Sequence, residues 1–280
     1  MKNPPKILLL IYCFTASILF AQPQNKNNNI VKIFSEDLNH FFGVGIGLVK
    51  SPSNFTTSDL YTTGIVVFGT TSLFAVDKNV REFSTSHNTN FQDNLFKTDD
   101  YYGSFYTTLL PVSLYGFGLF TENTKIRQLG LKTAEAFIYS GIITGIFKII
   151  IGRRRPYAGD SNMFFKPFQF TNNDYQSLPS GHTTVAFAVS TVMANYLDNF
   201  YWKVFWYGSA SMVAYSRMYH NKHWVSDVAL GAAIGFFVGK SVANFDNSHK
   251  NESLGIRINP FFTFNRIGFA VTFLYSVNLV

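Results

Sequence analysis

Six long apolar stretches with few charges constrain the fold of this 280-residue chain more than any other feature. They exceed the usual length of a strand, and they contain Ala, Leu and Gly without strict alternation of apolar and polar residues. We therefore expect six helices, over Leu60–Val76, Gly103–Thr121, Leu129–Ile151, His182–Leu197, Lys203–Ser216 and Ser226–Ala243. The connections between them, such as Thr85–Asn94 and Tyr157–Asp174, are rich in turn-forming residues and are expected to be loops.

The end of the chain has a different periodicity. From Ile267 to Leu279 every odd position is apolar, and Leu254 to Ile258 alternates in the same way. A period of two residues is typical of a strand with one buried face. We expect a small C-terminal β-hairpin whose apolar face covers the helical body, with contact to the envelope or to a partner as the alternative role.

The N-terminus has the layout of a secretory signal peptide. Two lysines precede an apolar run from Ile7 to Phe20, and Ala21-Gln22 follows. We expect cleavage after Ala21 and export to the periplasm, with an uncleaved membrane anchor as the alternative. The expected organisation is a signal peptide (1–21), a polar N-terminal segment and lead-in (22–58), a helical domain (59–245) and the hairpin (246–280).

Composition excludes several classes of protein. With 47% hydrophobic and 14% charged residues, the chain is not disordered. The single cysteine, Cys13, lies in the expected leader, which excludes a disulfide scaffold and a thiolate zinc site. The net charge of +7 favours anionic partners, but without a reader motif or a long basic run we expect no binding to nucleic acid.

The first cluster of chemically significant residues is Lys148 with Arg155-Pro156. The two cations are seven residues apart, at the end of a helix that Pro156 cannot prolong, so we expect both on one helix face. Arg153 and Arg154 are interpreted as cations that complement the helix dipole, or as basic residues at a membrane surface.

The second cluster is Pro179-Ser180-Gly181-His182 at the start of a helical run. A helix N-terminus offers unpaired N–H groups, and Gly181 lets an oxyanion approach the backbone closely. This predicts an anion pocket with His182 beside it. Helix capping by Ser180, with His182 as an ordinary helix residue, accounts for the local sequence equally well.

The third cluster is Ser216-Arg217 followed by His223 and Asp227. His223 and Asp227 are four residues apart and adjacent on a helix, so the carboxylate can hold one imidazole nitrogen and leave the other available as a nucleophile or base. Arg217 supplies a planar fork for phosphate oxygens. The alternative is a helix-surface pair with a solvated arginine, and His220 and Lys222 are interpreted as loop residues.

The chemistry of the same residues argues against a metal site. Two histidines and one aspartate could be ligands, but dense carboxylate or cysteine ligands are missing, and three nearby cations would repel a divalent ion. A phosphoryl group suits these residues better, so we expect no metal.

In this order, the three clusters resemble the signature of the type 2 phosphatidic acid phosphatase superfamily, which includes bacterial class A acid phosphatases and vanadium-dependent haloperoxidases. Eleven specified identities agree, between Lys148 and Asp227. The resemblance implies an all-α fold with the compact six-helix core of the acid phosphatase and haloperoxidase type. The leader and the hairpin lie outside it.

The resemblance also implies roles for individual residues. His223 would attack phosphorus and become a transient phosphohistidine, Asp227 would orient it, and His182 would protonate the leaving alkoxide. The phosphate oxygens would be held by Lys148, Arg155, Ser180, Gly181 and Arg217. Water would then hydrolyse the intermediate, and no metal or organic cofactor is implied.

Three functions follow as hypotheses. The first is a phosphatase that hydrolyses a phosphomonoester or pyrophosphate in the cell envelope, with a lipid-linked phosphate favoured by the family and by the aromatic content of 18%. The second is a vanadium haloperoxidase that holds vanadate on His223. The third is a non-catalytic envelope protein that binds anions.

The relation to the membrane is argued from topology and length. The family that this chain resembles includes six-span membrane enzymes and soluble helical enzymes. If the N-terminus is exported, six full spans would place Lys148–Pro156 on the cytoplasmic side. The integral members of that family have their site on the outer face, so the two expectations conflict. The run His182–Leu197 makes a helix of about 24 Å, shorter than the roughly 30 Å hydrocarbon core. We expect a compact helical enzyme in the periplasm with peripheral membrane contact.

Overall fold

The structure is a computed structural model that describes residues 30–86, 90–96, 101–159, 161–245, 254–263 and 266–275. The expected signal peptide lies outside the described residues. The chain divides into two compact units. The larger contains Phe55–Ala243, and the smaller contains Pro23–Asn54 and Asn244–Val280.

The larger unit is built of helices. Their bounds are α3 Thr57–Leu73, α4 Asp77–Thr85, α5 Asn90–Phe96, α6 Leu109–Phe120, α7 Thr124–Ile151, α8 Gly181–Leu197, α9 Phe200–Tyr219 and α10 Val225–Asn244. All six expected helices are confirmed, although the region expected as Gly103–Thr121 is divided into a short 3-10 helix, Phe105–Thr108, and α6. α5 replaces part of the loop expected at Thr85–Asn94.

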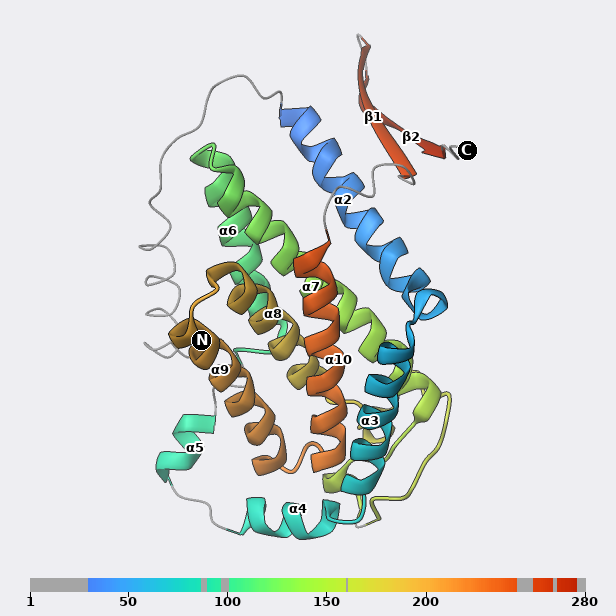
Figure 1. Ribbon diagram of the computed structural model, residues 1–280, viewed down its shortest axis with the longest axis vertical. Helices are drawn as coiled ribbons and strands as arrows, with labels where there is room; N and C mark the ends of the chain where they lie inside the picture. The colour runs from blue at the N-terminus through green and yellow to red at the C-terminus, as the bar shows by residue number, and fades with distance from the viewer. Residues whose placement is uncertain are drawn as a thin grey trace. The chain divides into compact units, whose positions relative to one another are not determined.

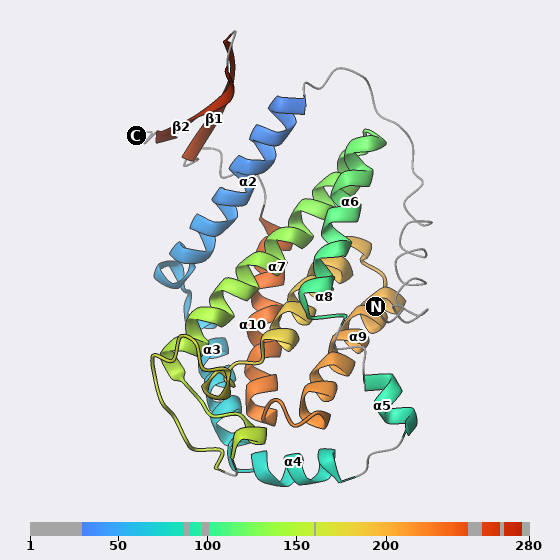
Figure 2. The same ribbon diagram turned by 180° about the vertical axis from the view of Figure 1, so that it is seen from behind.

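Within the larger unit, α10 is central, with α7 and α8 beside it and α4 lying across the end where α9 finishes and α10 begins (Figures 1 and 2). Most of α8 is buried, and its buried residues are mainly Ala, Val, Thr and Ser. These small side chains allow neighbouring helices to approach closely.

Glycines on α10 bring its backbone directly against α8. A Cβ atom added at Gly231 would lie 2.7 Å from the carbonyl oxygen of Ser180, and one at Gly235 would lie 2.2 Å from that of Thr184. Only glycine leaves room for this approach. Because both helices begin near this contact, it fixes the first residues of α8 relative to those of α10.

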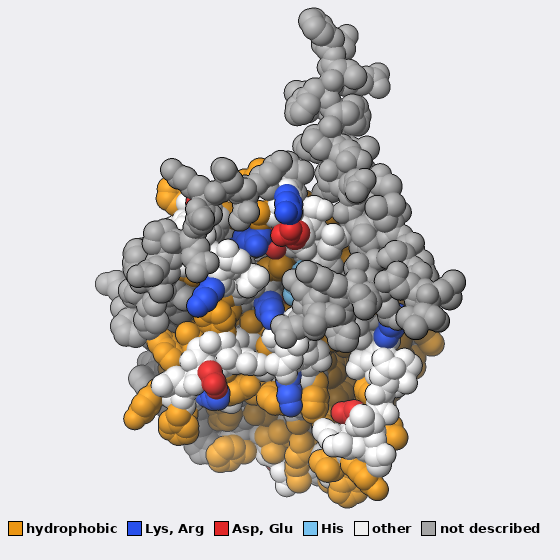
Figure 3. Space-filling view, turned by 45° about the horizontal axis from the view of Figure 1, so that its top comes forward, with side chains coloured by type: hydrophobic (Ala, Val, Ile, Leu, Met, Phe, Trp, Pro, Cys, Tyr) orange, Lys and Arg blue, Asp and Glu red, His pale blue; other side chains and the backbone are white. Residues whose placement is uncertain are grey.

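The exterior of the larger unit is unusually apolar. α7 and α10 are each long and apolar enough to cross a membrane, and the pair α3 and α4, bent by 63°, would make a third such element among the described residues. One face of α7 presents isoleucines at a spacing of four residues, each 38 to 52% exposed: Ile138, Ile142, Ile146 and Ile150. Hydrophobic side chains cover much of the described surface on the face shown in Figure 3.

The smaller unit combines one helix with a hairpin. β1 (Leu254–Thr263) and β2 (Arg266–Tyr275) pair antiparallel, with Leu254 opposite Tyr275, which is the hairpin that the alternating pattern predicts. That its apolar face covers the helical body stays a prediction.

The helix of the smaller unit, α2 (Ile30–Lys50), is followed by a 3-10 helix, Ser51–Asn54, and both replace most of the polar lead-in expected before residue 59. The ring of Phe245 lies against α2, since a Cβ atom at Gly43 or Gly47 would be within 3.3 Å of it.

Candidate active site

The three motifs meet at one pocket of about 420 Å³. Its lining residues are Lys148, Arg155, Tyr157, Asn173, Gly181, His182, Arg217, Lys222 and His223. Six of the eight residues predicted from the sequence are therefore brought together here. The other two, Ser180 and Asp227, are fully buried and do not line the pocket.

α7 ends earlier than the first motif suggests. Gly152 adopts a left-handed conformation, φ 61°, as the C-cap, and a Cβ atom there would lie 1.8 Å from the carbonyl oxygen of Lys166. The helix therefore stops before Arg155, and the expectation that Lys148 and Arg155 share one helix face is wrong. The cause is the glycine cap, four residues before the proline.

Arg155 reaches the pocket from an extended stretch instead. Its backbone N–H donates to the carbonyl of Asp174 at 2.7 Å, and that of Arg154 donates to the carbonyl of Phe164 at 3.0 Å. The loop that follows α7 thus returns along both sides of residues 153–155. These backbone bonds position Arg155 opposite the end of α7.

The two cations of the first motif donate to backbone carbonyls. Lys148 Nζ donates to the carbonyl of Gln176, and Arg155 Nε donates to that of Asn173 at 2.9 Å. Burial lowers the pKa of the Arg155 guanidinium, and the nearby charge of Arg217 lowers it further. Carbonyl oxygens satisfy donors without neutralising the charge, so both cations keep their attraction for an anion.

The second motif begins α8, but the capping alternative is wrong for the side chain of Ser180. Ser180 is the N-cap residue and makes no side-chain capping bond; its hydroxyl oxygen accepts from Thr183 Oγ1 at 2.9 Å. Its backbone N–H donates to the carbonyl of Asp227 at 3.0 Å, which ties the second motif to the third. A Cβ atom on Gly181 would meet Lys148 Cε at 3.6 Å, inside the pocket.

The third motif is only partly helical. α10 begins at Val225, so His223 precedes the helix, and the expectation that His223 and Asp227 lie on one helix is wrong. Asp227 lies in the first turn, where its Oδ2 accepts from the backbone N–H of Trp224 at 2.9 Å. Asp227 is the third residue of the helix and accepts from the N–H of the residue that precedes the helix, as in a capping box, which favours a helix start here.

The imidazole of His223 is held close to the carboxylate. Its Nδ1 lies 3.6 Å from Asp227 Oδ2, which is beyond hydrogen-bond range but close enough for a strong electrostatic effect. Burial lowers the pKa of His223 well below its usual value, and the cations of Lys148, Arg155 and Arg217 lower it further. The imidazole is therefore neutral, as a nitrogen nucleophile must be.

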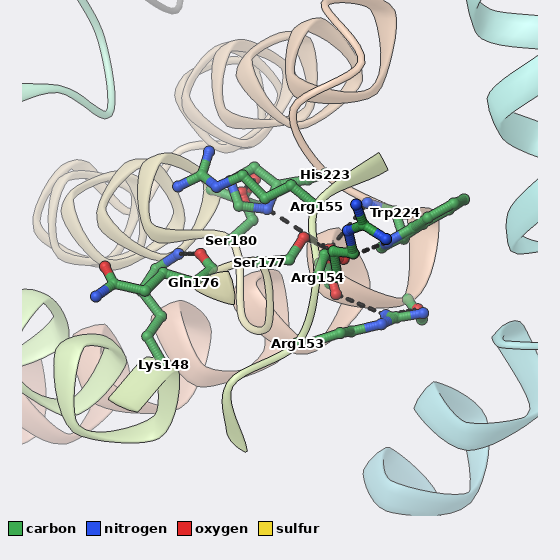
Figure 4. Close-up of polar contacts among 12 residues, drawn as sticks. Lys148, Arg153, Arg154, Arg155, Gln176, Ser177, Ser180, His223 and Trp224 are labelled. Atoms are coloured by element: carbon green, nitrogen blue, oxygen red, sulfur yellow. Dashed lines mark hydrogen bonds and ion pairs between the residues drawn. The ribbon is translucent and has the colours of Figure 1, made fainter. Parts of the chain in front are cut away.

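Arg153 contradicts the interpretation as a dipole-compensating or membrane-surface cation. It is 0% exposed, and it forms ion pairs of 2.6 Å with Asp77 and with Asp227. Figure 4 shows its guanidinium on the side of Trp224, away from Lys148. Its guanidinium lies 4.0 Å from the ring centroid of Phe74. Because an unpaired charge cannot be buried cheaply, the two carboxylates are the reason that this arginine is inside.

Three residues that line the pocket were not predicted from the sequence as site residues: Tyr157, Asn173 and Lys222. Lys222 Nζ lies 4.8 Å from the ring centroid of Tyr157. Burial raises the pKa of Tyr157, and a hydrogen bond with Asp174 contributes. Proximity to the motifs could have indicated two of these residues, since Tyr157 follows Arg155-Pro156 and Lys222 precedes His223.

The donor set suits an oxyanion. Among the described residues there is no group of three or more His, Cys, Asp or Glu side chains that could hold a metal ion. Four of the residues that line the pocket are cationic types, Lys148, Arg155, Arg217 and Lys222, and none is acidic. The first turn of α8 adds backbone N–H groups, which favour anions.

Residues 129–250 match the family model of the PAP2 superfamily. The chain carries a PAP2 superfamily domain. The PAP2 domain contains all eleven motif positions and runs from α7 to α10, so the resemblance seen in the sequence is confirmed.

Curated relatives of the PAP2 domain include two lipid A 1-phosphatases. The protein from Porphyromonas gingivalis is 28% identical over 243 residues, which cover 85% of this chain and 50% of the relative. The one from Rhizobium johnstonii is 32% identical over 122 residues, covering 41% and 49%. The chain thus spans about half the length of these curated relatives.

A solved structure shows the same fold. The first transmembrane PAP2-type phosphatidylglycerolphosphate phosphatase from Bacillus subtilis aligns with a TM-score of 0.50 at 19% identity. The alignment covers 75% of this chain and 96% of that chain. The helical arrangement predicted from the sequence is therefore confirmed.

Proposed function

We propose that this protein is a metal-independent phosphatase that hydrolyses a phosphomonoester or pyrophosphate, with a lipid phosphate as the favoured substrate. The observation that carries the proposal is the convergence of Lys148, Arg155 and Arg217 with two histidines on one pocket. Curated relatives named lipid A 1-phosphatases support the same class of reaction.

In the first step, Nε2 of His223 attacks phosphorus, because Nδ1 faces Asp227. The N–P bond forms as the bond from phosphorus to the leaving oxygen breaks, and His182 donates a proton to that oxygen. Charge on the equatorial oxygens is stabilised by the three cations and by the N–H groups at the start of α8.

In the second step, water attacks the phosphohistidine. His182, now neutral, accepts the proton of the water, and the N–P bond breaks to release phosphate and neutral His223. While the phosphoimidazole exists it carries positive charge, and the carboxylate of Asp227 opposes that charge. Ser180 does not line the pocket, so we propose that it acts through its backbone, whose N–H bond to the carbonyl of Asp227 holds the start of α8.

The apolar exterior supports a lipid substrate and a membrane location. The exposed isoleucine face of α7 ends at Ile150, two residues after Lys148. α7 spans about 42 Å, longer than the roughly 30 Å hydrocarbon core. The pocket would therefore lie where an apolar wall ends, which is where the headgroup phosphate of a lipid is found.

We therefore propose that α7 and α10 insert into the membrane of the cell envelope, a closer association than the peripheral contact expected from the sequence. Export to the periplasm stays part of the proposal. Alkaline carbonate extraction tests it, since an inserted protein stays in the membrane pellet and a peripheral one is released.

The activity is tested by phosphate release from phosphatidate, undecaprenyl pyrophosphate, lipid A and para-nitrophenyl phosphate in detergent, with a metal chelator present. We expect release from at least one lipid phosphate, unaffected by the chelator. Release from none of them would contradict the proposal, and bromide oxidation on addition of vanadate and peroxide would favour a haloperoxidase.

A further inference from the structure

We infer that Arg153 and Asp77 are positioning residues for this reaction: they fix the carboxylate of Asp227 and determine how much of its negative charge acts on His223. The inference rests on the proposed function. It extends the site to Asp77 on α4, which lies outside the residues 129–250 that match the family model.

Arg153 uses every donor that a guanidinium has. Nη1 donates to Asp227 Oδ1 at 2.6 Å and to Ser226 Oγ at 2.7 Å. Nη2 donates to Asp77 Oδ2 at 2.6 Å, and both Nη2 and Nε donate to the carbonyl of Asn162, at 2.8 and 3.0 Å. A group with five bonds has one possible orientation, so it can serve as a fixed reference for Asp227.

The carboxylate of Asp227 is fixed equally well. Oδ1 is occupied by Arg153, while Oδ2 accepts from the backbone N–H of Trp224 at 2.9 Å and from Ser177 Oγ at 2.5 Å. Oδ2 is also the oxygen nearest His223. The contact with the nucleophile is therefore made by a carboxylate that cannot rotate.

Asp77 completes the group from the other side. Its Oδ1 accepts from the backbone N–H and the hydroxyl of Ser226, at 3.0 and 2.9 Å, which links α4 to the first turn of α10. Arg153, Asp77 and Asp227 are all 0% exposed. The three charges therefore act on one another with little screening by water.

The number of charges explains why two carboxylates are present. One guanidinium between two carboxylates leaves a net charge of −1. If Asp227 were the sole partner of Arg153, that pair would be neutral, and it would stabilise the positive phosphohistidine weakly. Asp77 balances part of the guanidinium charge, so Asp227 retains negative charge toward His223.

The test is the acid limb of kcat/KM against pH, which reports protonation of His223 in the free enzyme. The groups that face this imidazole are Lys148, Arg155, Arg217, His182 and Asp227. None of these five residues is itself substituted in the Asp77 and Arg153 variants. The assay uses para-nitrophenyl phosphate and the full chain.

Two substitutions should move the limb in opposite directions. Asp77→Asn removes a negative charge, so we expect the limb to move to lower pH by about 0.5 to 1 unit and kcat to fall about tenfold. Arg153→Gln removes a positive charge, so the limb should move to higher pH. The double variant restores the net charge of −1, and its limb should return toward that of the native protein.

Glu135→Gln is the matched control. Glu135 is also 0% exposed, but it lies thirteen residues before Lys148 on α7, about 20 Å along the helix. We expect no shift of its acid limb. Shifts of Asp77→Asn and Arg153→Gln in the same direction, or no shift in either, would overturn the inference and leave a purely structural role.

Two additional measurements keep the test decisive. If Asp77→Asn does not fold, Arg153→Lys keeps the charge but loses the Nη bonds, and should lower kcat at least tenfold with the limb unmoved; a shifted limb would contradict the inference. If the native protein hydrolyses no phosphate ester, the proposed function fails, and the same opposite shifts are sought in the pH dependence of vanadate binding.

Discussion

Arg153 and Arg155 are two residues apart, but they have opposite surroundings. Arg153 belongs to the buried group behind the pocket, called here the base, and Arg155 to the lining of the pocket, called here the wall. In the base, Arg153 is bound to two carboxylates and fully buried. In the wall, Arg155 donates to a backbone carbonyl and lines the pocket. The base is rigid and carries a net charge of −1, whereas the wall keeps an excess of positive charge. A phosphatase needs both, because the nucleophile must be positioned and the anion must be attracted.

The strongest way to break this comparison is to remove a wall cation. Arg155→Gln should lower kcat/KM for para-nitrophenyl phosphate by about 10²-fold, as loss of one transition-state donor does. The melting temperature should stay the same or rise, because Arg155 is repelled by Arg217. A large loss of stability would show that Arg155 is structural, like Arg153.

Substitution of one glycine near the base should lower stability, whereas substitution of one glycine in the wall should lower activity. Gly231→Ala would place a Cβ atom 2.7 Å from the carbonyl oxygen of Ser180, so we expect a loss of about 1 to 3 kcal/mol in the free energy of unfolding. Gly181→Ala meets only ordinary contacts, the nearest at 3.6 Å. The Gly181→Ala variant should have the same free energy of unfolding as the native protein. Its kcat/KM should fall about tenfold or more, since the methyl group enters the pocket. Denaturant titration and the activity assay check both variants. A larger loss of stability in Gly181→Ala than in Gly231→Ala would contradict this account.

The lowered pKa of His223 gives a pH dependence with a definite sign. His223 binds a proton at about pH 6.5 in the unfolded chain and only at lower pH in the folded protein, so its contribution to folding stability is full above that pH and declines as the pH falls below it. His223→Gln should reduce this decline. For activity, the acid limb of a bell-shaped profile should lie below about pH 6.5, and a profile flat from about pH 4 to about pH 9 would contradict the pairing of a neutral His223 with a protonated His182.

The smallest expected effect is at the outer edge of the wall. Lys222 is exposed and contacts the ring of Tyr157, so Lys222→Gln should lower kcat/KM by no more than about fivefold, and less at high salt. Lys203→Gln is the matched control, because Lys203 pairs with Asp198 on the surface, away from the pocket. Equal effects of the two substitutions would show that Lys222 acts only through the net charge of the protein.

The sequence predicted the wall better than the base. The motifs specify residue types that bind phosphate, and six of them line the pocket. The partner of Arg153 could not be found in this way, because Asp77 lies 76 residues earlier and no local spacing rule connects them. An arginine in a run of three is expected to be solvent-exposed unless carboxylates that can pair with it inside the protein are identified.

The apolar stretches predicted the helix ends near the site to within one residue, but the motif spacings were wrongly interpreted as helical. The end of α7 depends on the left-handed conformation of Gly152, and the start of α10 depends on the capping bond of Asp227. The spacings of seven and four residues suggested that Arg155 and His223 lie on these helices, whereas both residues lie just outside them. α2 was not predicted, because the whole segment from residue 22 to residue 58 was interpreted as polar from the residues at its start.

Covalent labelling during turnover tests the central claim most directly. The protein is mixed with ³²P-labelled substrate, quenched in alkali, where phosphohistidine survives, and the labelled peptide is mapped by mass spectrometry. We predict the label on His223, with no label and no turnover in His223→Ala. Label on His182, or turnover that persists in His223→Ala, would contradict the account.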